Sequence, residues 1–277
     1  MDYLFEIGTE ELPAGSTGKI VSALQSSFDE GLKECGLAEY EIKQYFTPRR
    51  IALLVTNLPK ETPSKEIEVK GPGIKAPEQA VKGFAAKYNL KIEDLLQENN
   101  RYFLKQTIPA ISIKEVLKTN IQKSLASLSG ERWMTWADGE HSFARPVKWI
   151  VSLLEDKVLD LEVYGLQASN KTRVSRLKEA ELGEHKFFEI QTPSDYESLL
   201  KQNYVTADAK QRKELIKQQI KQIEENNNLK VQVPEDLLEE VVDLVEEPRT
   251  LVTSFAEKFL ELPEFLTTTV LINHQRY

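Results

Sequence analysis

Three carboxylates, Glu6, Glu10 and Glu11, follow one another closely near the start of the chain. Carboxylates in such a group could bind a divalent cation or act as a general acid and base. Neither use is favoured, because no histidine, aspartate or hydroxyl nucleophile stands nearby at a motif spacing. Solvation of a loop, or pairing with the positive end of a following helix, is the simpler interpretation. We therefore predict no catalytic pair here.

Other kinds of chemistry are equally hard to place. The sequence contains no glycine-rich phosphate loop, and Gly71-Pro72-Gly73 is too short and rigid to form one, so a turn is predicted there. The three histidines, His141, His185 and His274, lack the spacing that puts two imidazoles on one helix face. Cys35 comes late in a predicted helix, where the helix dipole does not stabilise a thiolate. We predict no catalytic residue, no metal site and no cofactor held by this chain.

Arg49 and Arg50 follow Thr47-Pro48 at the start of a predicted strand. Guanidinium groups suit phosphate recognition, which makes both residues candidates for contact with a nucleic acid. Adjacent side chains on a strand point to opposite faces of the sheet. We therefore expect that the two arginines do not act as one patch.

Basic side chains alternate with aromatic rings between residues 132 and 149. This combination can hold phosphates and stack on unpaired bases. The alternative is that the tryptophans belong to the core and that their neighbouring arginines pair with Glu131, Asp138 or Glu140, since tryptophan more often packs than binds. The candidates for RNA contact are Arg49, Arg50, Arg132, Trp136, Arg145 and Lys148.

The bulk composition limits the class of protein. With 277 residues and 40% hydrophobic residues, the chain can bury at least one large core, and its length favours two domains. A net charge of −8 repels a polyanion as a whole, so any RNA contact must be local. One cysteine, no secretory signal and no apolar stretch long enough for a membrane indicate a cytoplasmic protein without membrane contact.

Hydrophobic periodicity predicts an α+β fold with mixed or antiparallel sheets, packed helices and two lobes. Strands are expected over 3–7, 50–55, 66–70, 102–107, 147–154, 158–163 and 230–233, with a hairpin turn at 155–157. Helices are expected over 20–32, 77–88, 116–128, 209–226 and 237–245.

The change of composition along the chain predicts its domains. Residues 1–166 are expected to form an N-terminal α+β lobe, and residues 167–185 a polar linker with few apolar anchors. Residues 186–277 are expected to form a second α+β lobe. Its last residues stop in mid-pattern, which indicates a lobe truncated at its C-terminal end.

Six segments, in order, make the sequence similar to one family. They are FEIGTEELP at Phe5–Pro13, FTPRR at Phe46–Arg50, RWMTW at Arg132–Trp136, FARPVKW at Phe143–Trp149, FLELP at Phe259–Pro263 and HQRY at His274–Tyr277. The chain resembles the N-terminal part of the β subunit of the bacterial two-subunit glycyl-tRNA synthetase. Each segment is weak by itself, but their order over almost the whole chain is specific.

The resemblance implies a noncatalytic part of glycine-tRNA ligase, an aminoacyl-tRNA synthetase of protein biosynthesis. The α subunit of such a ligase would hold ATP and Mg²⁺ and form glycyl-tRNA. This chain would handle tRNA-Gly and assemble with the α subunit, in an α2β2 heterotetramer. Under this reading the six RNA candidates become tRNA-binding candidates.

The sequence departs from the family pattern in two places. Residues Lys171–Leu177 read KTRVSRL where the family tends to carry a Thr-Arg-Gly-His-Arg-like string, so that histidine's role is not transferred. Glu247 precedes Pro248, where an aromatic residue is usual.

Two other functions remain open. One is a protein-interaction scaffold without RNA contact, which the net charge of −8 favours. The other is a hydrolase that would use Glu6, Glu10 and Glu11 with a divalent ion, for which the only support is the local acidity.

Overall fold

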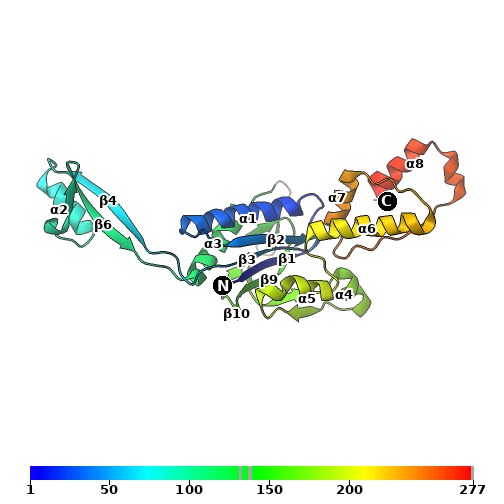
Figure 1. The fold of residues 1–277 in the computed structure, drawn as a ribbon, viewed down its shortest axis with the longest axis horizontal. Helices are drawn as coiled ribbons and strands as arrows, with labels where there is room; N and C mark the ends of the chain where they lie inside the picture. Colours follow the sequence, from blue (N-terminus) through cyan, green and yellow to red (C-terminus); the bar gives the residue numbers. More distant parts are fainter. Residues whose placement is uncertain (131–132, 137–138, 276–277) are drawn as a thin grey trace.

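An antiparallel five-stranded sheet forms the centre of the protein (Figure 1). The computed structural model describes residues 1–130, 133–136 and 139–275. The strand order is β10-β9-β1-β3-β2, so the first strand of the sequence is the middle strand of the sheet. The strands are β1 (Tyr3–Thr9), β2 (Glu41–Thr47), β3 (Arg50–Thr56), β9 (Val147–Leu154) and β10 (Lys157–Val158). The predicted α+β fold is confirmed.

Helices cover both faces of this sheet. On one face lie α1 (Thr17–Glu34) and α3 (Ile113–Ser127), whose apolar positions at spacings of three and four meet Phe5 and Ile7 of β1 in one core. On the other face, α5 (Tyr196–Gln202) packs against Leu4 of β1 in a second core. Because strand side chains alternate, β1 contributes to both cores, and every residue of it is buried.

Residues 65–108 form an arm that projects away from the central body (Figure 1). It consists of β4 (Lys65–Gly73), α2 (Glu78–Lys87), η1 (Ile92–Asp94), β5 (Leu96–Glu98) and β6 (Arg101–Ile108). A small core of its own contains Val81, Ala85, Leu95 and Leu104. Lys65 and Ile108 face each other across the β4–β6 ladder, so the arm enters and leaves the body at one place.

The C-terminal part is helical, with α6 (Ala209–Asn227), α7 (Glu235–Leu244), η3 (Glu257–Glu261), α8 (Glu264–Val270) and the π-helical residues Leu271–Gln275. The side chain of Asp208 caps the first turn of α6. Arg212 of α6 is fully buried and donates to the carbonyl oxygens of Phe46, Thr206 and Ala207 at 2.7–3.0 Å and of Val242 at 3.1 Å. This side chain ties α6 to the end of β2 and to α7. No described helix has the length and apolar character to cross a membrane.

Short elements complete the body. They are β7 (Met134–Trp136), β8 (His141–Phe143), β11 (Glu162–Val163), β12 (Leu166–Gln167), β13 (Lys171–Arg173), α4 (Arg176–Leu182), β14 (Phe187–Glu189) and η2 (Pro193–Asp195). The range 167–185, predicted as a polar linker, contains β13 and α4. The division into two lobes stays a prediction.

Three local predictions were wrong. Gly71-Pro72-Gly73 is the end of β4 and not a turn, because the ladder to β6 continues through a register shift between Lys70 and Gly73. Residues 230–233 form no strand, since they have no neighbouring strand and border an apolar groove beside α6 and α7. The strand predicted over 158–163 ends at Val158, and Glu162 and Val163 pair with β12 instead.

Candidate functional site

Glu6 lies on the middle strand, on the face of the sheet that α5 covers, and is fully buried. Its carboxylate accepts hydrogen bonds from Trp149 Nε1, Thr172 Oγ1 and Tyr196 Oη, each at 2.5 Å. The Arg50 guanidinium lies 3.9 Å away. A buried carboxylate is tolerated only with such partners. Glu6 is therefore a fixed internal acceptor and has no exposed edge for a substrate.

Arg49 and Arg50 are also buried, and they act together. Arg49 lies in the turn between β2 and β3. The backbone N–H of Thr9 donates a hydrogen bond to the Arg49 carbonyl oxygen and holds this turn in place. Its Nη2 contacts Glu246 Oε2 at 3.0 Å, and Nη2 of Arg50 contacts Glu246 Oε1 at 3.2 Å. The expectation that the pair points to opposite faces was wrong, because strand alternation does not apply to a turn residue.

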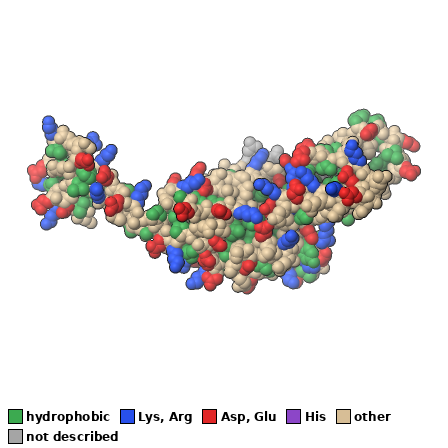
Figure 2. Space-filling view, viewed as in Figure 1, with side chains coloured by type: hydrophobic (Ala, Val, Ile, Leu, Met, Phe, Trp, Pro, Cys, Tyr) green, Lys and Arg blue, Asp and Glu red, His purple; other side chains and the backbone are tan. Residues whose placement is uncertain are grey.

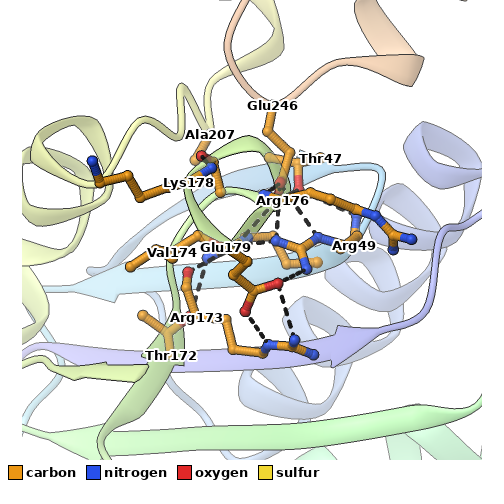
Figure 3. Close-up of polar contacts among 12 residues, drawn as sticks. Thr47, Arg49, Thr172, Arg173, Val174, Arg176, Lys178, Glu179, Ala207 and Glu246 are labelled. Carbon is orange, nitrogen blue, oxygen red and sulfur yellow. Dashed lines mark hydrogen bonds and ion pairs between the residues drawn. The ribbon is translucent and has the colours of Figure 1, made fainter. Parts of the chain in front are cut away.

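A second carboxylate extends this network (Figure 3). Glu179 of α4 contacts Arg49 Nη1 at 2.9 Å and Arg173 Nε at 2.7 Å. We call the six residues Glu6, Arg49, Arg50, Arg173, Glu179 and Glu246 the buried charge cluster. It contains three carboxylates and three guanidinium groups, so its formal charges balance. The cluster joins β1, the β2–β3 turn, β13, α4 and the chain after α7.

Local sequence explains how the cluster is assembled. The indole of Trp149 lies over Gly8, where an added Cβ would come within 1.8 Å of the ring. Glycine therefore lets Trp149 reach Glu6. Ser175 caps α4 by accepting from the Lys178 N–H, which orients the helix that carries Glu179. The Arg50 and Arg173 guanidinium groups lie 5.6 and 5.5 Å from the Trp149 ring and add cation–π attraction.

The arginines hold the two bridging carboxylates in their charged form. Burial by itself raises the pKa of Glu246, but Arg50, Arg49 and the Arg176 N–H outweigh it, so the pKa is lowered. The pKa of Glu179 is likewise lowered, because Arg173 and Arg49 outweigh burial. Both carboxyl groups therefore bind a proton more weakly in the folded chain than in the unfolded chain.

This depression predicts acid sensitivity. Stability from these two groups is complete above their unfolded pKa, 4.5, and is lost as the pH falls through their lower folded values. We expect the free energy of unfolding, measured by urea titration, to fall steeply below about pH 4.5, and Glu246→Gln to make that fall shallower. An equal acid slope in wild type and variant would contradict this role of Glu246.

The three carboxylates considered for catalysis do not meet. Glu10 and Glu11 lie on the surface, where they pair with Lys148 at 3.4 Å and Arg176 at 3.3 Å, while Glu6 is inside. Among the described residues, no group of three or more His, Cys, Asp or Glu side chains is placed to hold a metal ion. His185 contacts Arg173 and borders the cluster.

A second feature is a group of aromatic rings around the β7–β8 hairpin. Trp133 lies 4.9 Å from Phe143, and Trp136 lies 6.3 Å from His141 and 6.0 Å from Tyr164, measured between ring centroids. Trp133 and Trp136 pack against the large core yet stay partly exposed. The two rings thus combine core contact with partial exposure, and their contact with RNA stays a prediction.

The other predicted RNA contacts differ in exposure. Lys148 is exposed and paired with Glu10, whereas Arg145 is partly buried and donates to the Ala144 carbonyl oxygen at 2.7 Å. Arg132, Glu131 and Asp138 lie outside the described residues. Arg49 and Arg50 present no surface to a phosphate. Figure 2 shows cations and carboxylates interspersed over the visible face of the body.

Several residues of the cluster were not found in the sequence. Glu179 and Glu246 of the cluster, and its hydrogen-bond partners Thr172 and Tyr196, lie more than 120 residues from the groups they bind in β1, the β2–β3 turn and β3, and nothing local distinguishes them. The usable signal was the EIGTEELP and TPRR strings, whose Glu6, Gly8, Arg49 and Arg50 prove to be parts of one interior. The cluster joins these elements, and each of its six residues is at most 8% exposed.

The chain belongs to the glycyl-tRNA synthetase beta subunit family, whose sequence profile matches residues 3–277. Three relatives carry the name glycine–tRNA ligase beta subunit. That of Trichodesmium erythraeum is 37% identical over 99% of this chain and 40% of its own length. That of Thermotoga neapolitana is 33% identical over 99% and 41%, and that of Pseudomonas fluorescens is 33% identical over 100% and 41%. The chain spans about two fifths of the length of these relatives.

Proposed function

We propose that residues 1–277 are a noncatalytic part of a glycine–tRNA ligase that handles tRNA-Gly and assembles with an α subunit. The observation that carries this proposal is the family match along residues 3–277. In the proposed assembly, an α2β2 heterotetramer in the cytoplasm, ATP and Mg²⁺ are held by the α subunit and glycine is attached to tRNA there.

The interior supports a noncatalytic role. Three charged residues of the family-like strings, Glu6, Arg49 and Arg50, are at most 2% exposed, and each one binds other buried side chains. A catalytic acid or base must reach the proton that it moves. These groups instead give the chain a fixed shape. An accessory part that positions other molecules requires such a shape.

The aromatic rings near β7 and β8 support contact with RNA. Trp136 is partly exposed, and Arg145 and Lys148 follow on the same segment. Arginine and lysine bind phosphates, and aromatic rings stack on unpaired bases. Arg49 and Arg50 serve this contact indirectly, by fixing the β2–β3 turn in the body.

The first test is size-exclusion chromatography with light scattering of this chain mixed with a bacterial glycyl-tRNA synthetase α subunit, with and without tRNA-Gly. A joint peak with the α subunit, retained when tRNA is added, is the expected result. Absence of every joint peak, with protein and with RNA, would overturn the proposed role of residues 1–277.

The basic side chains give a second prediction. If Arg145 and Lys148 contact phosphates, each alanine substitution should weaken tRNA binding and reduce the slope of log affinity against log salt by about one. Filter binding over a salt series measures the slope, and Lys123→Ala on the exposed side of α3 is the matched control. Unchanged slopes in both variants would remove these two residues from the tRNA contact.

The second candidate function is a protein-interaction scaffold without RNA contact. The net charge of −8 favours it. Two results together would distinguish it. The chain would form a joint peak with the α subunit, and it would neither bind tRNA by itself nor raise the tRNA affinity of the complex above that of the α subunit alone. A divalent-ion hydrolase finds no support, since Glu6 is separated from Glu10 and Glu11 by its burial.

A further inference from the structure

A cavity of about 550 Å³ lies between the C-terminal end of α3 and the β7–β8 hairpin. Its size falls in the range of small-ligand pockets. Two aromatic side chains, Trp133 and Tyr164, line it together with His141, and the polar groups of Gln122, Ser129 and Ser142 complete part of its rim. This cavity is separate from the buried charge cluster, whose residues do not line it.

The aromatic walls share one anchor. Phe143 is fully buried, and its ring lies 4.9 Å from Trp133 and 5.5 Å from Tyr164. The His141 ring meets Tyr164 at 6.2 Å and 83°. Since Phe143 touches both walls, Trp133 and Tyr164 are held at a fixed spacing around the cavity.

Backbone features at both walls hold the rings in place. Tyr164 has a φ of 54° and is followed by Gly165 at 72°, which is a rare conformation for a bulky residue. The Trp133 Nε1 lies against Gly130, where an added Cβ would come within 2.0 Å. Tyr164 and Gly165 form the two-residue turn between β11 and β12, which requires positive φ at both positions, so the hairpin fixes Tyr164 at the cavity wall.

The chemistry of the lining restricts the class of ligand that fits the cavity. Within the part of the chain that the structure describes, the Trp133 Nε1–H and the Tyr164 hydroxyl have no hydrogen-bond partner, although both residues line the cavity. The described lining contains the carboxylate of Glu140 and no lysine or arginine, which disfavours a phosphate inside. A planar ring with hydrogen-bonding edges fits these walls, with any phosphate left outside.

We propose that this cavity binds an exposed nucleobase, stacked against Trp133 and Tyr164. The inference rests on the proposed handling of tRNA, and it adds the place and the chemical group that are recognised. The base belongs to an unpaired nucleotide of the RNA or to a free nucleotide, and the same measurement distinguishes the two.

The test measures binding of a fluorescein-labelled single-stranded RNA hexamer, and of tRNA-Gly, to the chain in complex with the α subunit. Stacking on an aromatic ring contributes enough that Trp133→Leu and Tyr164→Ala should each weaken hexamer binding about tenfold. Gly130→Ala should do the same by displacing the indole without removing it. Met134→Ala, an exposed neighbour that does not line the cavity, should leave the affinity unchanged.

Two further measurements keep the inference open to contradiction if a variant misfolds. Ultraviolet crosslinking of 5-bromouridine hexamer to the unmodified chain should give adducts on Trp133 or Tyr164. If AMP displaces the hexamer at concentrations similar to that of the hexamer, the bound base belongs to a free nucleotide. If AMP does not displace it, the base belongs to RNA. Adducts elsewhere, or three folded variants that bind the hexamer like wild type while tRNA-Gly still binds, would overturn this inference alone. Failure of wild type to bind any RNA or AMP would overturn it together with the proposed function.

Discussion

Replacing Glu6 with alanine should lower the free energy of unfolding far more than any surface substitution. The change leaves Trp149 Nε1, Thr172 Oγ1 and Tyr196 Oη without their acceptor and takes a carboxylate from beside Arg50. Unpaired buried donors cost about 1–3 kcal/mol each and a buried charge that loses its partner costs about 3–5 kcal/mol, so we expect a loss of at least about 4 kcal/mol. Urea unfolding followed by circular dichroism measures it.

The matched control lies four residues away. Glu10 belongs to the same string, but it is about half exposed and pairs only with Lys148. Glu10→Ala should change stability by less than about 0.5 kcal/mol. A similar small effect of Glu6→Ala would contradict the central position that we assign to this carboxylate.

Glu246→Ala should have the second large effect. This carboxylate bridges Arg49 and Arg50 and accepts from the Arg176 backbone N–H at 2.7 Å. Its removal takes a carboxylate partner from two buried guanidinium groups, and we expect the free energy of unfolding to fall by about 3–5 kcal/mol. Hydrogen exchange should show the loss first in α4 and in the chain around α7, which Glu246 connects to the β2–β3 turn.

Neighbouring variants separate charge from shape. Glu246→Gln keeps the shape of the side chain but replaces one carboxylate oxygen with an NH2 group and removes the charge, so its stability should fall between those of wild type and Glu246→Ala. Glu247→Ala, which breaks only a surface pair with Arg249, should be close to neutral. Equal stability of the Glu246 and Glu247 alanine variants would contradict the bridge.

Helices and strands could be predicted from the sequence where the local spacing of apolar side chains determines the secondary structure. Ile20, Leu24 and Phe28 recur at helical spacing, and α1 follows them because it buries that stripe on the sheet. The strand predicted over 230–233 was wrong because a strand depends on more than its local pattern. Alternating apolar residues favour an extended chain, but a strand needs a neighbour, and the sequence does not say whether one is present.

The buried charge cluster could not be predicted for a different physical reason. Arginines before a strand are equally suited to a phosphate and to a buried carboxylate, because both partners offer paired oxygens to the same planar group. The choice depended on Glu179 and Glu246, more than 120 residues away. Only the closing of the fold brings them within reach.

The arm described above has a consequence for folding order. Its strands are close in sequence and share a core that no residue of the body enters, so its contacts are local. Local contacts form fast, because little chain entropy is lost in closing short loops. The central sheet, by contrast, must bring β9 beside β1 across the arm's whole length of chain. During synthesis, residues 65–108 can therefore fold as a finished unit while β1 and β3 still wait for the strand that completes their sheet.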